Sequence, residues 1–489
     1  MPQATALLSK KLSSRSPEIV IENIFLGGIA DSTYVGLKNS VTSIVGFDIH
    51  SVPGALLVAQ QMTLESGAPT DDLYKILPCS DGNIYLFGKT NGKVYKNASG
   101  TYTLLGTVSP AAGSAGILDA IEFNNNIYYF MQSRVGEWTF ASAFSTRNDS
   151  KFTFSVTNST YHPSIIVNDV LYIGDGTNIA QIDTSDVFTG NALVLSSPQI
   201  ICSLGRQVTD LLIGTIISNS VPISHVFRWD TWSISYTNDY PVPEVGVNCF
   251  IQAGDTDVQI QAGLSGNIYA LVSSVFKLIK QVPSNFPTVY SPSAQANANY
   301  PAVAVLNGVP LFGMSNVTGN PGYQGVYAYG SHASNYPKVL SLPYPISTGN
   351  LSNVTVWSLA VVGLTLYISW KDTTSGTVYG VDKLDYSNKF TSAFFETRLI
   401  KFSRIFLDIY SKVVVNYQTL PASCDIKIYQ NSDWAGYVQY TGSDIYTDSD
   451  RTQVVGNLQP RAKSIMFKIE PVVSGNNAPI IEDVIVLPE

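Results

Sequence analysis

The residues best suited to catalysis are few in this chain and lie far apart. The histidines are His50, His162, His225 and His332, and the cysteines are Cys79, Cys202, Cys249 and Cys424. A triad can be assembled from distant segments, but no GxSxG elbow, HExxH, P-loop or Rossmann fingerprint accompanies these residues. The cysteines show no CxxC spacing, so isolated buried thiols are the default interpretation. We therefore expect no catalytic residues, no metal site and no cofactor.

Three short acidic clusters could offer carboxylates to calcium. They are Gly254-Asp255-Thr256-Asp257, Asp183 to Asp186, and Asp448 to Asp450. None has the ligand spacing and glycine of an EF-hand loop. Asp and Ser favour turns in which the side chain binds the backbone two residues on, so we expect turns rather than metal sites.

One segment, His225-VFRWDTWSISY, combines a guanidinium, a carboxylate and two indoles. Arg228, Trp229, Asp230 and Trp232 are a mixture suited to stacking on carbohydrate or to an interface hot spot. The alternative is structural: Trp229 and Trp232 on one face of a strand, with an Arg-Asp pair across the turn. We favour this alternative, because similar aromatics recur elsewhere in the chain at structural spacing.

The composition narrows the classes of partner. The chain has 489 residues, of which 45% are hydrophobic and 13% charged, with a formal net charge of -8. Tight nucleic-acid binding needs clustered Lys and Arg, and only Ser9 to Arg15 is locally basic. No stretch has the length of a signal-peptide core or of a membrane-spanning helix, so neither is expected.

The positions of turns and apolar runs predict an all-β chain with an internal repeat. Helical periodicity is nearly absent, whereas β-branched residues, Tyr, Gly and Asn recur at turn spacing. Seven copies of a turn, an apolar strand, a second turn and a further apolar strand can be aligned, starting at Asp81, Asn124, Val167, Val208, Ser265, Leu306 and Val362. Spacings of about 40 to 50 residues are typical of propeller blades.

The sequence therefore predicts a seven-bladed β-propeller followed by a small C-terminal β-sandwich. We expect an extended N-terminal arm over 1–40, the propeller over 41–390 and the sandwich over 391–489. A propeller closes best when one blade combines strands from both ends of the chain, so we expect Ala55 to Leu64 to be the closing strand, which completes the blade that contains Leu364 to Lys383.

Tyrosine recurs at one position of the repeat. It is Tyr85, Tyr128, Tyr172, Tyr269 and Tyr367. We expect each ring to pack between blades with its hydroxyl near solvent, and regard a sugar-stacking role as the less favoured interpretation.

The order of these segments resembles β-propeller structural proteins of tailed bacteriophages. FLGGIADSTYVG from Phe25 precedes IVGFDIHSVPGALLVAQQMTLESG, then repeats of the DGNIYLFGKTNGKVYK type, then the terminal block from RLIKFS to RAKSIMFKIEP. The resemblance implies a non-enzymatic virion protein, a nozzle, hub or tail-tip component. Such a protein assembles in the host cytoplasm as a ring of copies around the DNA exit path and contacts adaptor, tube or fibre proteins.

Two other functions stay open. The chain could be a carbohydrate-binding propeller, either a receptor-binding tail protein or a lectin. A glycan-cleaving propeller enzyme would need paired carboxylates at the axial mouth, and the sequence does not identify such a pair.

Overall fold

The computed structural model describes an all-β protein. It covers residues 20–488 except 24–26, 31–39, 53, 110–115, 157–158, 219, 255–256, 283–296, 316–323, 332–336, 350–352, 402–410, 441–452 and 459–463. Within these residues the one helical element is the 3-10 turn η1 (Phe144–Thr146). No helix of the described residues is long and apolar enough to cross a membrane. Most of the expected arm over 1–40, including Ser9 to Arg15, lies outside the described residues.

The chain divides into two units. The larger unit contains residues 62–329 and 345–384, and the smaller unit contains 1–61, 330–344 and 385–489. This division differs from the predicted one, because 41–61 and 330–344 group with the C-terminal strands. Strand pairing supplies the physical reason, since strands within 41–61 pair with C-terminal strands, and Leu342 pairs with Val45.

The larger unit consists mainly of four-stranded antiparallel sheets, each formed by consecutive strands. In chain order the first three sheets contain β8 (Leu73–Pro78), β9 (Ile84–Gly88), β10 (Lys93–Ala98), β11 (Thr101–Thr107); β12 (Asp119–Phe123), β13 (Asn126–Met131), β14 (Arg134–Thr139), β15 (Asn148–Thr153); and β16 (Ser164–Val167), β17 (Val170–Asp175), β18 (Asn178–Ile182), β19 (Phe188–Val194).

The remaining strands of this unit continue the pattern. They are β20 (Ile200–Gln207), β21 (Asp210–Ile216), β22 (Ser224–Trp229), β23 (Asn238–Val242); β24 (Val247–Ala253), β25 (Asp257–Ala262), β26 (Asn267–Val272), β27 (Val275–Gln281); β28 (Asn297–Leu306), β29 (Val309–Ser315), β30 (Gly325–Gly330); and β32 (Val354–Val362), β33 (Thr365–Asp372), β34 (Val378–Lys389), with β7 (Gln60–Leu64) beside β34.

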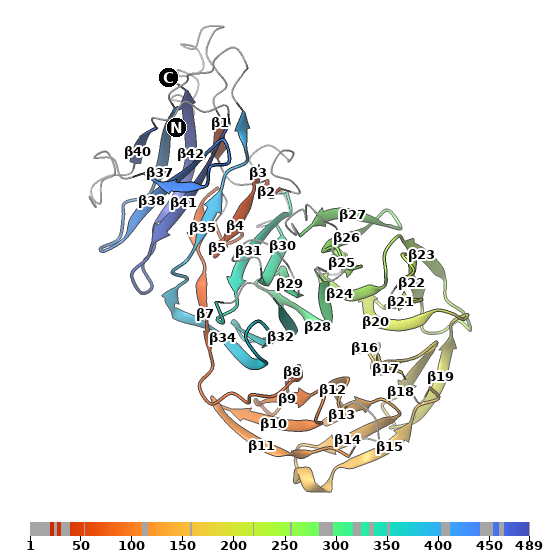
Figure 1. Cartoon of the computed structure of the whole chain (residues 1–489). Coiled ribbons are helices and arrows are strands. Elements are labelled where there is room, and N and C mark those ends of the chain that lie inside the picture. Colours follow the sequence, from red (N-terminus) through yellow and green to blue (C-terminus); the bar gives the residue numbers. More distant parts are fainter. Residues whose placement is uncertain are drawn as a thin grey trace. The chain divides into compact units, whose positions relative to one another are not determined.

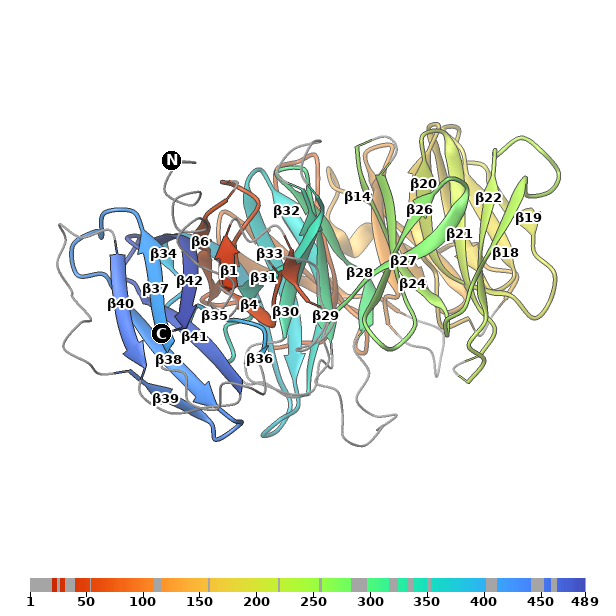
Figure 2. The same cartoon turned by 90° about the horizontal axis from the view of Figure 1, so that it is seen from above.

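The sheets of the larger unit are arranged around a common centre (Figure 1), and Figure 2 shows the same strands after a turn of 90°. The first strand of each sheet contacts the first strand of the next, from β8 through β12, β16, β20, β24 and β28 to β32, and β32 contacts β8. Buried apolar clusters lie between neighbouring sheets, and one of them joins the last sheet to the first through Leu73, Leu86, Ala360 and Val381. The fold is therefore propeller-like, with each sheet burying its two faces against its neighbours.

β7 lies where the sequence analysis placed the closing strand, although it is shorter than expected. The backbone N–H of Glu65 donates to the carbonyl of Val381 at 2.9 Å. The first half of the expected segment forms a separate strand, β6 (Leu56–Val58), which pairs within the smaller unit. The last sheet thus joins chain segments that are some 300 residues apart in sequence, as 62–64 and 378–384 show.

The hairpin turns have the backbone that their dipeptides predict. Asn124 and Asn125 both have positive φ, at 50° and 62°, as do Asn307 and Gly308 at 52° and 77°. Two consecutive residues with positive φ match the twist of the flanking strands, and Asn and Gly adopt them at little steric cost.

One of the seven aligned copies is out of step with the others. The copies at Asp81, Asn124, Val167, Val208, Leu306 and Val362 begin at the turn between the first and second strands of a sheet, whereas Ser265 lies between β25 and β26. The turn that corresponds to the others is near Gly254, between β24 and β25. A Gly-Asn turn before an apolar, Tyr-bearing strand occurs at the later position, which explains the mismatch and the uneven spacings.

The repeated tyrosines are packing residues, as predicted. The rings of Tyr85, Tyr128 and Tyr172 are at most 3% exposed. Two of their hydroxyls donate to carboxylates: Tyr85 donates to Asp81 at 2.6 Å, and Tyr128 donates to Asp186 at 2.8 Å. Because Asp186 belongs to the following sheet, the second bond ties neighbouring sheets together.

The smaller unit contains strands from both chain ends. One set pairs in the order β40 (Gln453–Leu458), β37 (Ser411–Tyr417), β42 (Ile480–Pro488), β6, β5 (Phe47–Asp48), with β1 (Val20–Asn23) also on β42. The other runs β31 (Val339–Pro345), β4 (Ser43–Val45), β35 (Phe394–Glu396), β41 (Ser464–Val472), β38 (Asp425–Ser432), β39 (Tyr437–Gln439), with β36 (Ile400–Lys401) on β41. β2 (Gly28–Ile29) pairs with β3 (Ser40–Val41).

An aromatic contact joins the two sets. Phe47 of the first meets Phe395 of the second edge to face, with ring centroids 6.1 Å apart, and both rings are fully buried.

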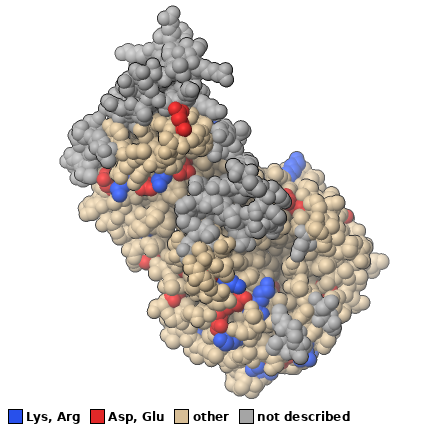
Figure 3. Space-filling model, viewed as in Figure 1, with Lys and Arg blue, Asp and Glu red and all other residues tan. Residues whose placement is uncertain are grey.

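The surface reflects the low charge content. On the face shown in Figure 3, charged side chains are sparse among the described residues and most of the surface is neutral.

Candidate functional site

Five of the seven first strands depart from regular pairing in the larger unit, whereas β12 and β16 pair without a shift. The register shifts at Tyr74 in β8, Cys202 in β20, Asn248 in β24, Trp357 in β32, and between Ala298 and Val303 in β28. A bulge adds a residue to one strand only, and it changes the direction of the side chain there. Tyr74, for example, packs against Trp357 of a neighbouring sheet, with ring centroids 5.4 Å apart.

The bulge in β28 places Tyr300 across the centre. Its hydroxyl donates to the backbone carbonyl of Ser164 in β16 at 2.6 Å. The sheets of β28 and β16 are not neighbours, since the sheets of β20 and β24 separate them on one side and those of β32, β8 and β12 on the other. This hydrogen bond therefore spans the space that the first strands enclose.

Three further polar contacts extend this bond into a network. The hydroxyl and the backbone N–H of Ser164 donate to Asp119 at 2.6 and 3.1 Å. The ammonium of Lys75 forms an ion pair with the same carboxylate at 2.8 Å. Asp119 is fully buried, and an unpaired charge there would be costly, so Lys75 and Ser164 hold it in place. We call Lys75, Asp119, Ser164 and Tyr300 the axial plug.

Burial dominates the electrostatics of Tyr300. It raises the pKa of Tyr300 well above the ordinary value, and the nearby Asp119 carboxylate raises that pKa further. The phenol is therefore neutral at any physiological pH and acts as a hydrogen-bond donor to Ser164.

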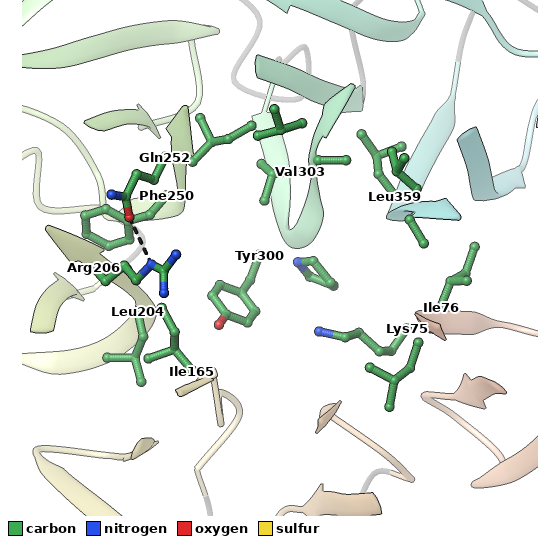
Figure 4. A pocket seen from close by; sticks show the side chains of 18 of the residues that line it. Lys75, Ile76, Ile165, Leu204, Arg206, Phe250, Gln252, Tyr300, Val303 and Leu359 are labelled. Carbon is green, nitrogen blue, oxygen red and sulfur yellow. Dashed lines mark hydrogen bonds between the residues drawn. The ribbon is translucent and has the colours of Figure 1, made fainter. Parts of the chain in front are cut away.

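A cavity of about 510 Å³ adjoins the axial plug and is lined by the first strands of several sheets (Figure 4). Most lining side chains are apolar, including Ile76, Leu204, Val303 and Leu359. Tyr300 lies between the side chains of Lys75 and Arg206 in Figure 4. We call this cavity the axial well.

Two polar side chains of the axial well contact each other. The Nε–H of Arg206 in β20 donates to Oε1 of Gln252 in β24 at 3.1 Å, the dashed line in Figure 4. Arg206 is exposed, whereas Leu204 in the same strand and Phe250 in β24 are buried, so Arg206 lies at an open part of the well.

The acidic clusters behave as turns where the structure describes them. Asp183 accepts the backbone N–H groups of Ser185 and Val187 at 2.8 and 3.0 Å, which confirms the predicted turn. Among the described residues no group of three or more His, Cys, Asp or Glu side chains could hold a metal ion. Asp448 to Asp450 and Asp255 lie outside the described residues.

The four residues selected around the Arg-Trp-Asp-Trp segment do not form one site. Arg228 pairs with Asp210 at 2.5 Å rather than with Asp230. Trp229 is 2% exposed, whereas Trp232 is 86% exposed, so the two indoles do not share a face. The strand ends at Trp229, and the residues that follow form a turn, which is why the alternation expected of a strand fails.

Asp230 organises that turn. Its carboxylate accepts the backbone N–H groups of Trp232 and Ser233 at 2.9 and 2.8 Å, and the hydroxyl of Ser233 at 2.7 Å. The turn is thus fixed by hydrogen bonds while it presents Trp232 and the 99% exposed Ile234 to solvent.

Trp229 belongs to a packing motif that occurs in two sheets. Its indole N–H donates to the carbonyl of Ser233 at 2.7 Å, and its ring meets Tyr172 of the preceding sheet edge to face at 5.7 Å. Trp138 does the same, donating to Ser142 at 3.1 Å and meeting Tyr85 at 5.3 Å.

The described histidines and cysteines are dispersed. His162 is buried between the carbonyls of Gly174 and Gln132, and burial lowers its pKa. His225 pairs with Asp239, and all four cysteines are free thiols. His332 lies outside the described residues.

Sequence reasoning missed the axial plug and the axial well. One available signal was Pro301, because proline inside a strand marks a bulge or an edge. Lys75, Asp119 and Ser164 carry no local pattern, and only the ring of first strands brings them together.

No protein-family model matches the chain, and no curated protein matches it. Among solved structures the chain is similar to the extracellular domain of the hybrid two-component system BT4673 from B. thetaiotaomicron, at 14% identity and a TM-score of 0.46, covering 76% of this chain and 42% of that one. It is similar to a streptogramin B lyase at 9% identity and a TM-score of 0.45, covering 67% and 97%, and to U3-55K at 9% and 0.48, covering 66% and 98%. The chain therefore spans less than half of the BT4673 domain. Such similarities concern the fold alone and add nothing to the all-β, propeller-like architecture that the sheets already show.

Proposed function

We propose that the chain is a non-enzymatic structural protein of a phage tail, a nozzle, hub or tail-tip component of the virion. The phage assignment rests on the resemblance of the sequence to β-propeller structural proteins of tailed bacteriophages. The observation that carries a structural role is the closed circuit of first strands, in which β32 contacts β8 and β7 completes the last sheet. In a closed circuit each sheet packs between two neighbours and only short strand edges remain, so the unit suits a rigid spacer.

The finer architecture is part of this proposal. The larger unit is taken as a seven-bladed propeller, because seven first strands follow one another around the circuit from β8 to β32. The smaller unit is taken as the β-sandwich, built from two strand sets that meet through Phe47 and Phe395. In this architecture N-terminal strands complete the sandwich as well as the propeller.

The axial plug bears on where DNA would pass. Tyr300 and Ser164 join opposite sides of the larger unit by a hydrogen bond, so a duplex has no path through its centre. The DNA exit path would instead be enclosed by several copies of the chain in a symmetric ring. An acidic chain of net charge -8 suits such a conduit, because like charge prevents tight binding of the genome.

The test uses the phage genome that encodes the chain. Purified particles should contain the protein at a fixed copy number by quantitative mass spectrometry, and negative-stain images should place it in the tail after antibody labelling. A nonsense mutation in its gene should yield particles with incomplete tails, restored by the wild-type chain in trans. Complete, infectious particles without the protein would refute the proposal.

A second candidate function is carbohydrate binding through Trp232. The indole is 86% exposed on a turn that Asp230 holds in place, and a preorganised exposed aromatic ring suits stacking on a sugar. A glycan array with the wild type and Trp232→Ala tests this function. Trp434→Ala is the matched control, since Trp434 is 55% exposed in the smaller unit. Glycan binding that Trp232→Ala leaves unchanged would exclude this site.

A further inference from the structure

We propose that the axial well binds a small amphipathic anion, in which one carboxylate contacts Arg206 and an apolar body fills the well. This inference is independent of any role in a virion. It rests on the shape of the cavity, the chemistry of its walls and the distribution of charge around it.

The size and walls of the well suit an apolar body. Its volume of about 510 Å³ lies within the ~300–1,000 Å³ typical of small-molecule sites. Leu204, Val303 and Leu359 come from three different sheets, so a ligand would contact a wall that only the assembled unit provides. The axial plug closes the centre beside the well and prevents a ligand from passing through.

The charge of the well is opposite to that of the chain. Its lining residues include the cations Lys75 and Arg206 and no Asp or Glu, whereas the chain carries a net charge of -8. Lys75 is neutralised by Asp119 at 2.8 Å. Arg206 instead donates to the neutral amide of Gln252, and the closest acidic residue in sequence, Asp210, is paired with Arg228.

Arg206 is therefore the cation of the well that is left for a ligand. A guanidinium binds a carboxylate through two parallel N–H groups, and the Nε–H bond to Gln252 fixes its orientation. The cavity of the smaller unit differs in charge, because its lining includes the carboxylate of Glu470, which pairs with Lys468 at 2.6 Å.

The test measures binding of two fluorescent probes to the full chain. 8-Anilinonaphthalene-1-sulfonate carries an anionic group on an apolar body, and N-phenyl-1-naphthylamine is its uncharged counterpart. We expect saturable binding of the anion, a loss of about tenfold in affinity for Arg206→Gln, and little change for the uncharged probe, since a charge-assisted hydrogen bond contributes roughly one such factor or more. Lys277→Gln, which removes an exposed cation from β27, is the matched control and should change neither affinity.

A second variant separates the well from other apolar surfaces. Ala304→Trp places a bulky ring in the well and should abolish binding of both probes, with the far-UV circular dichroism spectrum and the urea midpoint unchanged. Decanoate and 2-naphthoate, an aliphatic and an aromatic acid, compete for the site and show which body fits better, whereas decanol should compete at least about tenfold more weakly than decanoate.

Three results would overturn the inference. They are anion binding unaffected by Arg206→Gln, an equal loss for Arg206→Gln and Lys277→Gln, and binding that survives Ala304→Trp. If Ala304→Trp fails to fold, the comparison of Arg206→Gln with Lys277→Gln decides the question without it.

Discussion

Trp229 and Trp232 lie three residues apart and should differ greatly in what they contribute to stability. Trp229 is 2% exposed, packs edge to face on Tyr172 at 5.7 Å and donates its indole N–H to Ser233 at 2.7 Å. Trp232 is 86% exposed, and the hydrogen bond that fixes it uses its backbone N–H rather than its side chain. Alanine at each position therefore tests the packing between two sheets against a control in the same turn.

The expected magnitude follows from these contacts. Replacing a buried Trp by Ala costs about 3–5 kcal/mol, which includes the cavity and the lost aromatic pair. The carbonyl of Ser233 also loses its donor, but the turn is exposed, so water can replace it and we expect about 4 kcal/mol in total. For Trp232→Ala the expected change is within about 0.5 kcal/mol, as for surface substitutions in general.

The assay is equilibrium unfolding in urea, followed by far-UV circular dichroism because each substitution removes a fluorophore. Trp229→Ala should lower the midpoint of the larger unit's transition strongly with little change in slope, and Trp232→Ala should leave it in place. Equal midpoints for the two variants would refute the inter-sheet packing of Trp229. A Tyr172→Ala variant should show coupling with Trp229→Ala of about 0.5–1.5 kcal/mol, the usual range for an aromatic pair.

Three further outcomes are expected. Tyr300→Phe removes the donor to Ser164 and should lower the free energy of unfolding by about 1–2 kcal/mol in urea titrations; no change would mean that the plug bond is dispensable. Met62→Ala in β7, 2% exposed in the wild type, should cost about 2–4 kcal/mol, against about 0.5 or less for the 52% exposed Leu64→Ala, and similar midpoints would contradict the closing role of β7. Burial raises the pKa of Asp175 to about 6, above the pKa of the same carboxyl in the unfolded chain. The contribution of this shift to the free energy of unfolding is therefore fully present below the pKa of the unfolded chain, and it is lost as the pH rises through 6. Relative to Asp175→Asn, the wild type should therefore lose up to about 3 kcal/mol between pH 4 and pH 7.5, and a constant difference across this range would contradict the shift.

Local sequence was sufficient to predict the turns and the strands that follow them. Positive φ at Asn124, Asn125 and Asn307 follows from dipeptides that favour tight hairpins, and burial of the repeated tyrosines follows from their spacing. The repeat failed at Ser265 because a Gly-Asn turn can precede either the second or the third strand of a sheet. Turn chemistry specifies that a hairpin exists but not which strands of the sheet it joins.

The site could not be predicted in the same way. The turn at Asp230 interrupts the strand that would have placed Trp229 and Trp232 on one face, and a single Asx-type cap decides this. Arg228 pairs with Asp210 in the adjacent strand rather than with Asp230, two residues further along the chain, because strand pairing sets which side chains meet. Contacts between strands depend on register, which a pattern of residue types leaves open.

The bulge in β28 shows why the axial plug belongs to the whole circuit and not to one sheet. The backbone N–H of Ala298 donates to Oε1 of Gln261 in the preceding sheet at 2.9 Å, and Asn299 donates to the carbonyl of Val356 in the following sheet at 2.6 Å. Pro301 has no N–H to leave unpaired. The bulge is thus hydrogen-bonded to both neighbours, through the backbone N–H of Ala298 on one side and the side-chain amide of Asn299 on the other, and these bonds form only while the neighbours are in place. Tyr300 can reach across to Ser164 for the same reason, which makes the plug and the adjoining well consequences of closure.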